Sequence, residues 1–221
     1  MSRLIDVSHI VEDGLITYPG LPGPIVCDFL SREASRALYS EDTTFQIGKI
    51  ELVANTGTYV DSPFHRYEHG DDLAALDLAC LADVPGVVID ASTFPTRAID
   101  TNRFQGFDLQ RKAVLVRTGW DRHWATPAYV NGHPYLTRDA AEFLRDAGVA
   151  IVGIDSLNID DTTDWARPVH TILLGAGIPI VEHLCALVEL PLVGFRFHAV
   201  PVKFRGVGTF PVRAYGVADE S

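Results

Sequence analysis

The sequence is short of positive charge. Its 221 residues contain 18 Lys and Arg against 29 Asp and Glu, which gives a formal net charge of -11. Nucleic acids and anionic membrane surfaces attract basic patches, and this chain has no Lys/Arg run that would form one. We therefore expect neither nucleic acid nor membrane as a partner.

Long apolar runs are also lacking. The longest apolar region, residues 172–195, contains two prolines and three polar or charged residues, so it cannot supply the ~20 consecutive apolar residues of a membrane span. The first residues, MSRLIDVSHIVEDG, carry Asp6 and Glu12 where a signal peptide would need an apolar core. These two features predict a cytoplasmic protein.

Cysteine is scarce. Cys27, Cys80 and Cys185 are widely spaced and form no CxxC pair, which predicts reduced, mostly buried thiols. The chain does have enough apolar residues for a core, since 47% of its residues are hydrophobic and 10% are aromatic. At this length we expect one globular domain covering residues 1–221.

The pattern of apolar residues predicts many strands and few helices. One helix is expected at 137–148, where Thr137 can cap the first turn and Gly148 can end it. A second is expected at 168–174, where Pro168 suits the first helical position. The strands, rich in Val, Ile and aromatic residues, are expected at 4–7, 44–54, 86–89, 113–117, 149–154, 178–181 and 192–202. This order predicts a single-domain α/β fold with a mixed sheet.

The stretch NTGTYVDSPFH, residues 55–65, follows one of these strands. Asp61 and His65 lie four residues apart, Pro63 stiffens the turn between them, and Gly57 allows a backbone conformation that other residues resist. Carboxylate oxygen and imidazole nitrogen are suitable ligands for Zn²⁺, Mn²⁺ or Fe²⁺. Taken alone, an Asp and a His near a turn more often form an Asx-turn beside a surface or hydrogen-bonded histidine, so this stretch by itself does not establish a metal site.

A second pair of such residues lies downstream, in VHTILLGAGIPIVEH. His170 is expected near the start of a helix, and Glu182 ends the strand that follows, so the two can meet at one site. A carboxylate placed after the apolar run IPIV is costly to bury without a cation or hydrogen-bond donors. The partner of Glu182 is therefore a metal ion, an arginine or a backbone amide.

Collinear segments along nearly the whole chain resemble the cyclase family of metal-dependent hydrolases, which includes bacterial kynurenine formamidases and isatin hydrolases. The segments are DVSHIVEDGLITYPGLPGP, TGTYVDSPFH, VRTGWDRHW, HPYLTRDAAEFL, VGIDSLNID, VHTILLGAGIPIVEHL and PVKFRGVGTFPVRAYG. The resemblance implies the family's swivelling β/β/α fold. It also implies a homodimer or homotetramer, for which the segment ITYPGLPGPIV could supply an exchanged interface.

The family motif HxGTHxDxPxH is only partly present. The resemblance implies that Asp61, His65, His170 and Glu182 are metal ligands, whereas Asn55 and Tyr59 stand where the motif has histidines. A neutral amide and a phenol with an ordinary pKa of ~10 are poor replacements for imidazole. We therefore expect a site for one divalent metal ion, Zn²⁺ or Mn²⁺, rather than two.

The activity that the resemblance implies is hydrolysis of a small amide, an N-formyl arylamine or a lactam. His65, His170 and Glu182 are the candidates for proton transfer, and the sequence does not choose among them. A noncatalytic protein that binds a small molecule on the same fold is the alternative. No GxSxG motif is present, so a serine hydrolase is not favoured. The aromatic residues expected to shape the substrate pocket are Tyr18, Tyr59, Trp120 and Trp124.

Overall fold

A nine-stranded mixed sheet forms the centre of the protein in a computed structural model that describes residues 2–219. Strands β5, β7, β9 and β10 run parallel to one another, and the other pairs are antiparallel. The mixed sheet predicted from the sequence is confirmed. In spatial order the strands are β1 (Ser2–Asp6), β13 (Tyr215–Asp219), β11 (Val193–His198), β5 (Val84–Asp90), β7 (Ala113–Arg117), β9 (Ile151–Ile154), β10 (Ile180–Glu182), β4 (Tyr59–Asp61) and β12 (Thr209–Pro211).

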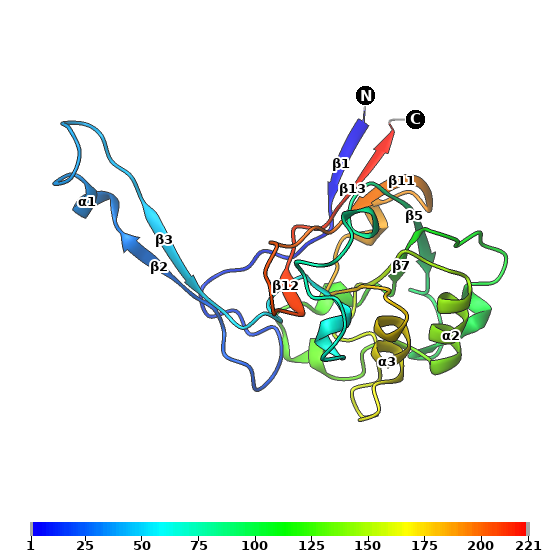
Figure 1. Ribbon diagram of the computed structural model, residues 1–221. Helices are drawn as coiled ribbons and strands as arrows, with labels where there is room; N and C mark the ends of the chain where they lie inside the picture. The colour runs from blue at the N-terminus through cyan, green and yellow to red at the C-terminus, as the bar shows by residue number, and fades with distance from the viewer. Residues whose placement is uncertain (1, 220–221) are drawn as a thin grey trace.

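Two helices, α2 (Arg138–Asp146) and α3 (Pro168–Gly175), lie side by side over one face of the sheet (Figure 1). Side chains alternate between the faces, so Val114 and Val116 pack under these helices while Leu115 joins a second core on the other face. Both predicted helices are confirmed, and the Thr137 hydroxyl accepts a hydrogen bond from the amide of Ala140 at 3.3 Å. The sheet and its two helices therefore form the rigid frame of the site.

The remaining elements are short. A separate two-stranded sheet pairs β6 (Ala98–Ile99) with β8 (Tyr135–Leu136). Single turns of 3-10 helix connect the larger elements at η1 (Pro63–His65), η2 (Leu78–Cys80), η3 (Thr101–Arg103), η4 (Trp120–His123), η5 (Pro127–Val130) and η6 (Leu187–Glu189). Within residues 2–219, no helix combines the length and the apolar character that crossing a bilayer needs.

A β-hairpin projects from the body of the protein like an arm (Figure 1). It consists of β2 (Ile25–Leu30) and β3 (Ile47–Glu51), and the short helix α1 (Arg32–Ser35) lies near its tip. The sequence predicted one longer strand at 44–54 and did not predict β2. The structure confirms a strand within 44–54, although β3 is shorter than predicted. The prediction missed β2 because the apolar residues of the arm have no sheet face to cover, so their pattern lacks the alternation of a half-buried strand.

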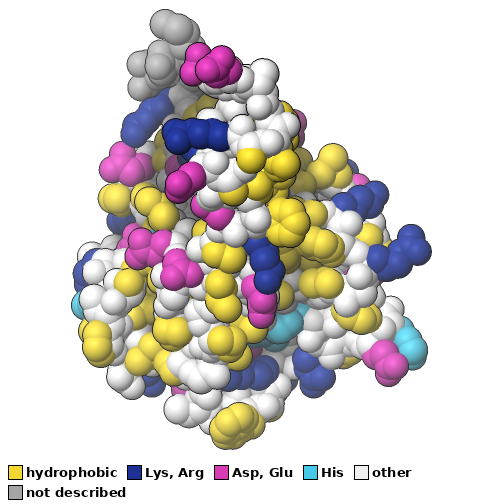
Figure 2. Space-filling model, turned by 90° about the vertical axis from the view of Figure 1, so that its left-hand side faces the viewer, with side chains coloured by type: hydrophobic (Ala, Val, Ile, Leu, Met, Phe, Trp, Pro, Cys, Tyr) yellow, Lys and Arg dark blue, Asp and Glu magenta, His cyan; other side chains and the backbone are white. Residues whose placement is uncertain are grey.

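The arm exposes apolar side chains to solvent. Phe29 is 75% exposed and Ile50 64%, and the face of the molecule from which the arm projects carries many hydrophobic side chains (Figure 2). The arm also carries Cys27, which is exposed, while Cys80 and Cys185 are half-buried. The three thiols are free as predicted, but the prediction that they are mostly buried was wrong, because the arm lies outside both cores.

Candidate functional site

The strand pairing around β4 brings distant residues to one place. Asp61 lies opposite Ile180 of β10 on one side and opposite Thr209 of β12 on the other. Tyr59, two residues earlier and thus on the same face of the strand, lies opposite Glu182. The register of these three strands therefore sets Asp61, Thr209, Tyr59 and Glu182 side by side.

The turn after β4 directs His65 toward Asp61. The amide of Ser62 donates to the carbonyl oxygen of Gly208 at 2.7 Å, and η1 begins at Pro63, as its stiffening role predicts. A Cβ on Gly208 would lie 2.4 Å from the backbone nitrogen of His65, so only glycine allows this close approach. Earlier in the stretch, Gly57 has the positive φ of +65° that the sequence suggested.

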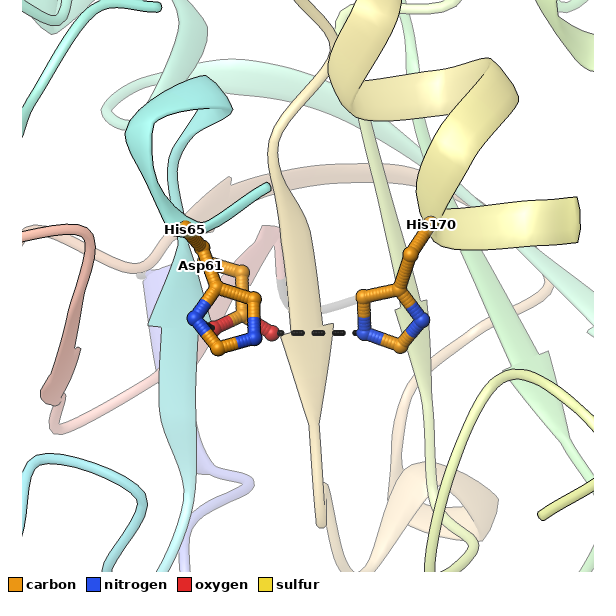
Figure 3. A group of neighbouring side chains, drawn as sticks. All are labelled: Asp61, His65 and His170. Carbon is orange, nitrogen blue, oxygen red and sulfur yellow. Dashed lines mark ion pairs between the residues drawn. The ribbon is translucent and has the colours of Figure 1, made fainter. Parts of the chain in front are cut away.

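Asp61, His65 and His170 form a compact group in which one ligand atom from each lies within 4.8 Å of the others. Figure 3 shows the His65 ring overlapping the Asp61 carboxylate and the His170 ring facing them, with a dashed line from an oxygen of Asp61 to His170. The distance from Asp61 Oδ2 to His170 Nε2 is 3.7 Å, and that from Asp61 Oδ1 to His65 Nδ1 is also 3.7 Å. Within residues 2–219 this buried Oδ2 has no hydrogen-bond partner, whereas Oδ1 accepts from the Thr209 hydroxyl. The site therefore contains an unsatisfied carboxylate oxygen that faces an imidazole nitrogen.

His170 is held by Asp160, which the sequence analysis did not single out. Its Nδ1 lies 2.6 Å from Asp160 Oδ2, and the same carboxylate accepts from the amides of Val169 and His170 at the start of α3. Burial opposes the imidazolium, but the hydrogen bond to Asp160 and the charges of Asp61 and Glu182 raise the pKa of His170 to about 10. A carboxylate behind a ligating histidine fixes its ring orientation, leaving Nε2 to face the site.

The carboxylate of Asp61 is ionised in this setting. Burial disfavours its charge, yet the neighbouring His65 and His170 outweigh burial and lower its pKa. The group of three thus places an anionic oxygen and two imidazole rings at one point. This is the donor set expected for Zn²⁺ or Mn²⁺, and a bound ion would replace the proton on Nε2 of His170.

Glu182 lies next to this group, with Oε1 3.7 Å from His170 Nε2. Oε1 accepts from the backbone amide of Ile159 at 2.7 Å, and Oε2 accepts from the Tyr59 hydroxyl at 2.6 Å and from Asn158 Nδ2 at 3.3 Å. Of the three partners that the sequence left open, a backbone amide is therefore present. Burial raises the pKa of Glu182 to about 7, although the charge of His170 opposes the rise.

Tyr59 belongs to a buried chain of hydrogen bonds that ends at Glu182. Tyr129 Oη lies 2.9 Å from His183 Nδ1, and His183 Nε2 lies 3.3 Å from Tyr59 Oη. Burial lowers the pKa of His183 to about 3 and raises that of the Tyr59 phenol well above its usual range, so both groups are neutral. A neutral His183 accepts from Tyr129 and donates to Tyr59, which leaves the Tyr59 hydroxyl hydrogen for Glu182.

A cavity of about 260 Å³ opens above the group. Two of the four aromatic residues predicted to shape the pocket, Tyr18 and Tyr59, line it together with Asn55. The structure places the other two elsewhere. Trp120 donates its indole N–H to the carbonyl oxygen of Tyr129 at 2.9 Å, and Trp124 stacks on His9 and lines a different cavity. The cavity wall also includes Leu21, Arg66, Asn158, Arg167 and three of the residues described above, His65, His170 and Glu182.

Sequence reasoning thus missed the residues that support the predicted ones. Asp160 and Asn158 lie in VGIDSLNIDD, just after a predicted strand, and a carboxylate at that position ahead of a predicted helix is the one local signal that could have found Asp160. Thr209 joins the site only through the pairing of β12 with β4. No local pattern in the sequence marks it.

The chain is similar to known proteins over most of its length. Residues 5–161 match the model of the Cyclase family. Kynurenine formamidase from Bacillus cereus is 28% identical over 214 residues, which cover 96% of both chains. Among solved structures, isatin hydrolase A from Labrenzia aggregata has a TM-score of 0.85 at 20% identity and covers 99% of this chain and 94% of its own. A structure described as a potential metal-dependent hydrolase with cyclase activity has a TM-score of 0.80 at 24% identity, and the match covers 100% of both chains. These structural likenesses concern the fold.

Proposed function

Because the chain belongs to the Cyclase family, we propose that it is a metal-dependent hydrolase that cleaves a small amide, an N-formyl arylamine or a lactam. The named relatives support this reaction class, since a kynurenine formamidase and an isatin hydrolase are hydrolases by name. The proposal includes one divalent ion, Zn²⁺ or Mn²⁺. It also includes a small-molecule substrate. The volume of the cavity, about 260 Å³, is slightly smaller than the ~300–1,000 Å³ of pockets that bind drug-sized ligands.

The observation that carries the proposal is the unsatisfied Oδ2 of Asp61. This buried oxygen accepts no hydrogen bond and faces His170 Nε2 at 3.7 Å, so a divalent ion between the two atoms would satisfy the oxygen and take the place of the His170 proton. His65 and His170 add imidazole nitrogens within 4.8 Å, so the residues present fit a divalent ion. Asn55 and Tyr59 add no second set of imidazoles, which supports one ion rather than two.

A bound ion would polarise the carbonyl group to be cleaved and lower the pKa of water. Asp61, His65 and His170 would hold it, and Asp160 would keep the His170 ring in place. A group that binds an ion cannot carry a proton at the same time. We therefore assign proton transfer to Glu182, which lies beside the group and whose pKa is about 7, close to the working pH of most enzymes.

Metal analysis and activity assays on the same preparation test the proposal. The protein purified without chelator should contain about one Zn²⁺ or Mn²⁺ per chain and should hydrolyse N-formyl arylamines or cyclic amides. Chelation should abolish turnover, and added Mn²⁺ or Zn²⁺ should restore it. A protein that binds no ion and hydrolyses none of these compounds would instead be a noncatalytic binding protein on the same fold.

We also propose that the arm, β2 and β3, packs against a second copy of the chain in a dimer or tetramer. A lone two-stranded hairpin is marginally stable in water, and this one exposes Phe29 and Ile50 on its surface. Light scattering should give at least twice the 24.2 kDa of one chain for the wild type. The double variant Phe29→Lys, Ile50→Lys should shift toward 24.2 kDa, while Leu78→Lys, at an exposed site on the body, should not. A monomeric wild type would disprove this assembly.

A further inference from the structure

Arg167 lines the cavity but has no acidic partner. Within residues 2–219, no carboxylate oxygen lies in ion-pair distance of its guanidinium group, although the chain carries 29 acidic residues. The acidic residues of the same loop are occupied elsewhere. Asp160 binds His170 and the start of α3, Asp161 accepts from Thr163, and Asp164 accepts from the amide of Ala166. A half-buried cation is thus left facing the cavity.

The backbone of Arg167 holds the side chain in that direction. Its φ of 46° and ψ of 60° lie in the left-handed region, which is unfavourable for a residue with a Cβ and more so before a proline. Strained residues of this kind concentrate at functional sites. The guanidinium Nη1 makes only long contacts, 3.4 Å to Asn158 Oδ1 and 3.5 Å to the carbonyl oxygen of Asp161. Within residues 2–219, the other N–H donors of the Arg167 guanidinium group have no hydrogen-bond partner.

Tyr18 provides a second free donor in the same cavity. Within the described part of the chain, its buried hydroxyl makes no hydrogen bond, and the side chain of Asn158 is a polar neighbour. Burial and the charge of Glu182 raise the pKa of this phenol, and the charge of Arg167 opposes the rise. The hydroxyl thus stays protonated and lies within electrostatic reach of the guanidinium group. The two donors are suited to the same acceptor.

We infer that Arg167 and Tyr18 form a subsite for an anionic group of the substrate, so that the preferred substrate is an amide that carries a carboxylate. A guanidinium group binds a carboxylate through two parallel hydrogen bonds, and a phenol hydroxyl adds a third. Arg66, at the mouth of the same cavity and stacked on Tyr67, adds positive charge. The inference rests on the proposed hydrolase function and adds the class of substrate.

A pair of substrates that differ only in the carboxylate tests the inference. N-formyl-2-aminobenzoate and N-formylaniline share the scissile bond, and selectivity is the ratio of their kcat/KM values. Arg167→Gln should lower this ratio about 10- to 100-fold, the effect of losing one charge-assisted contact. Tyr18→Phe should lower it less. Arg138→Gln removes the same charge from the exposed start of α2 and should leave the ratio as in the wild type.

The outcomes separate this inference from the proposed function. If Arg167→Gln lowers both kcat/KM values equally, the residue is structural and the anion subsite is wrong, although the enzyme is a hydrolase. If the wild type cleaves neither substrate, the proposed function fails. The anion subsite can then be tested separately, by measuring the equilibrium binding of 2-aminobenzoate. Binding that is at least tenfold weaker in Arg167→Gln than in Arg138→Gln would support the subsite, and equal binding would overturn it.

Discussion

Replacing Asp61 with asparagine should greatly weaken metal binding and leave the fold intact. The substitution keeps the shape of the side chain and the oxygen that accepts from Thr209, but removes the charge from the buried Oδ2 that faces His170. A neutral amide is a poor ligand for Zn²⁺ or Mn²⁺, so affinity for the ion should fall on the order of 100-fold or more. Turnover should fall with it. Calorimetric titration of chelator-treated protein with Zn²⁺ measures the loss directly.

The stability of the metal-free variant separates a binding defect from a folding defect. Asp160 still pairs with His170, and Thr209 keeps its acceptor, so the variant should still unfold in one cooperative urea transition. Because one charge of a buried pair is lost, its free energy of unfolding should be lower than that of the metal-free wild type by at most about 3 kcal/mol. Asp108→Asn, an exposed carboxylate paired with Lys112, is the matched control and should bind the ion normally. Wild-type affinity in Asp61→Asn would place the metal outside this group.

The central part of the site can be derived from local sequence. Asp61 and His65 are separated by only three residues in a stiff turn, so their proximity depends on little else. His170 lies in the first turn of α3, and Glu182 is the last residue of β10. The apolar residues of both elements can be recognised in the sequence, and a helix followed by a strand of the sheet beneath it brings the two residues near each other. Local spacing therefore predicted two separate pairs, and the resemblance to the family joined them into one site. The structure gathers three of the four residues as a compact group with Glu182 at its edge.

The supporting residues depend on contacts that no local pattern encodes. Thr209 lies beside Asp61 only because β12 pairs with β4 in one register, and 148 residues separate the two in sequence. Asp160 and Arg167 take their roles from the path of one loop, including the left-handed backbone at Arg167. Loop geometry of this kind is set by the packing around it, so composition alone does not reveal it.

The two tryptophans show the limit of reasoning from residue type. Trp120 and Trp124 lie in VRTGWDRHW, one of the segments that resemble the family, and aromatic residues do line ligand pockets. They equally fill cores, and here they pack among Tyr129, His9 and the turns η4 and η5 instead. Whether an aromatic side chain turns toward a cavity or away from it depends on backbone direction at that point. Tyr18, by contrast, does reach the cavity.

Glu182→Gln should stop turnover without removing the ion. Under the assignment made here, Glu182 carries a proton and the other three residues bind the metal, so kcat should fall about 10²- to 10⁴-fold, while the metal content stays near one ion per chain. The fold can accept glutamine. Its oxygen can take the Ile159 amide, and its NH₂ group can donate to Tyr59, whose hydroxyl hydrogen then turns to His183.

Metal content and rate measured on one preparation decide between two roles for Glu182. Loss of the ion together with turnover would show that Glu182 is a ligand, as its 3.7 Å distance from His170 Nε2 would also allow, and would overturn its assignment to proton transfer. Glu189→Gln, an exposed carboxylate paired with Arg3, is the matched control and should keep both properties. A lowered kcat with KM and metal content unchanged is the result expected of a group that acts only on the proton, because neither substrate binding nor the ion depends on it.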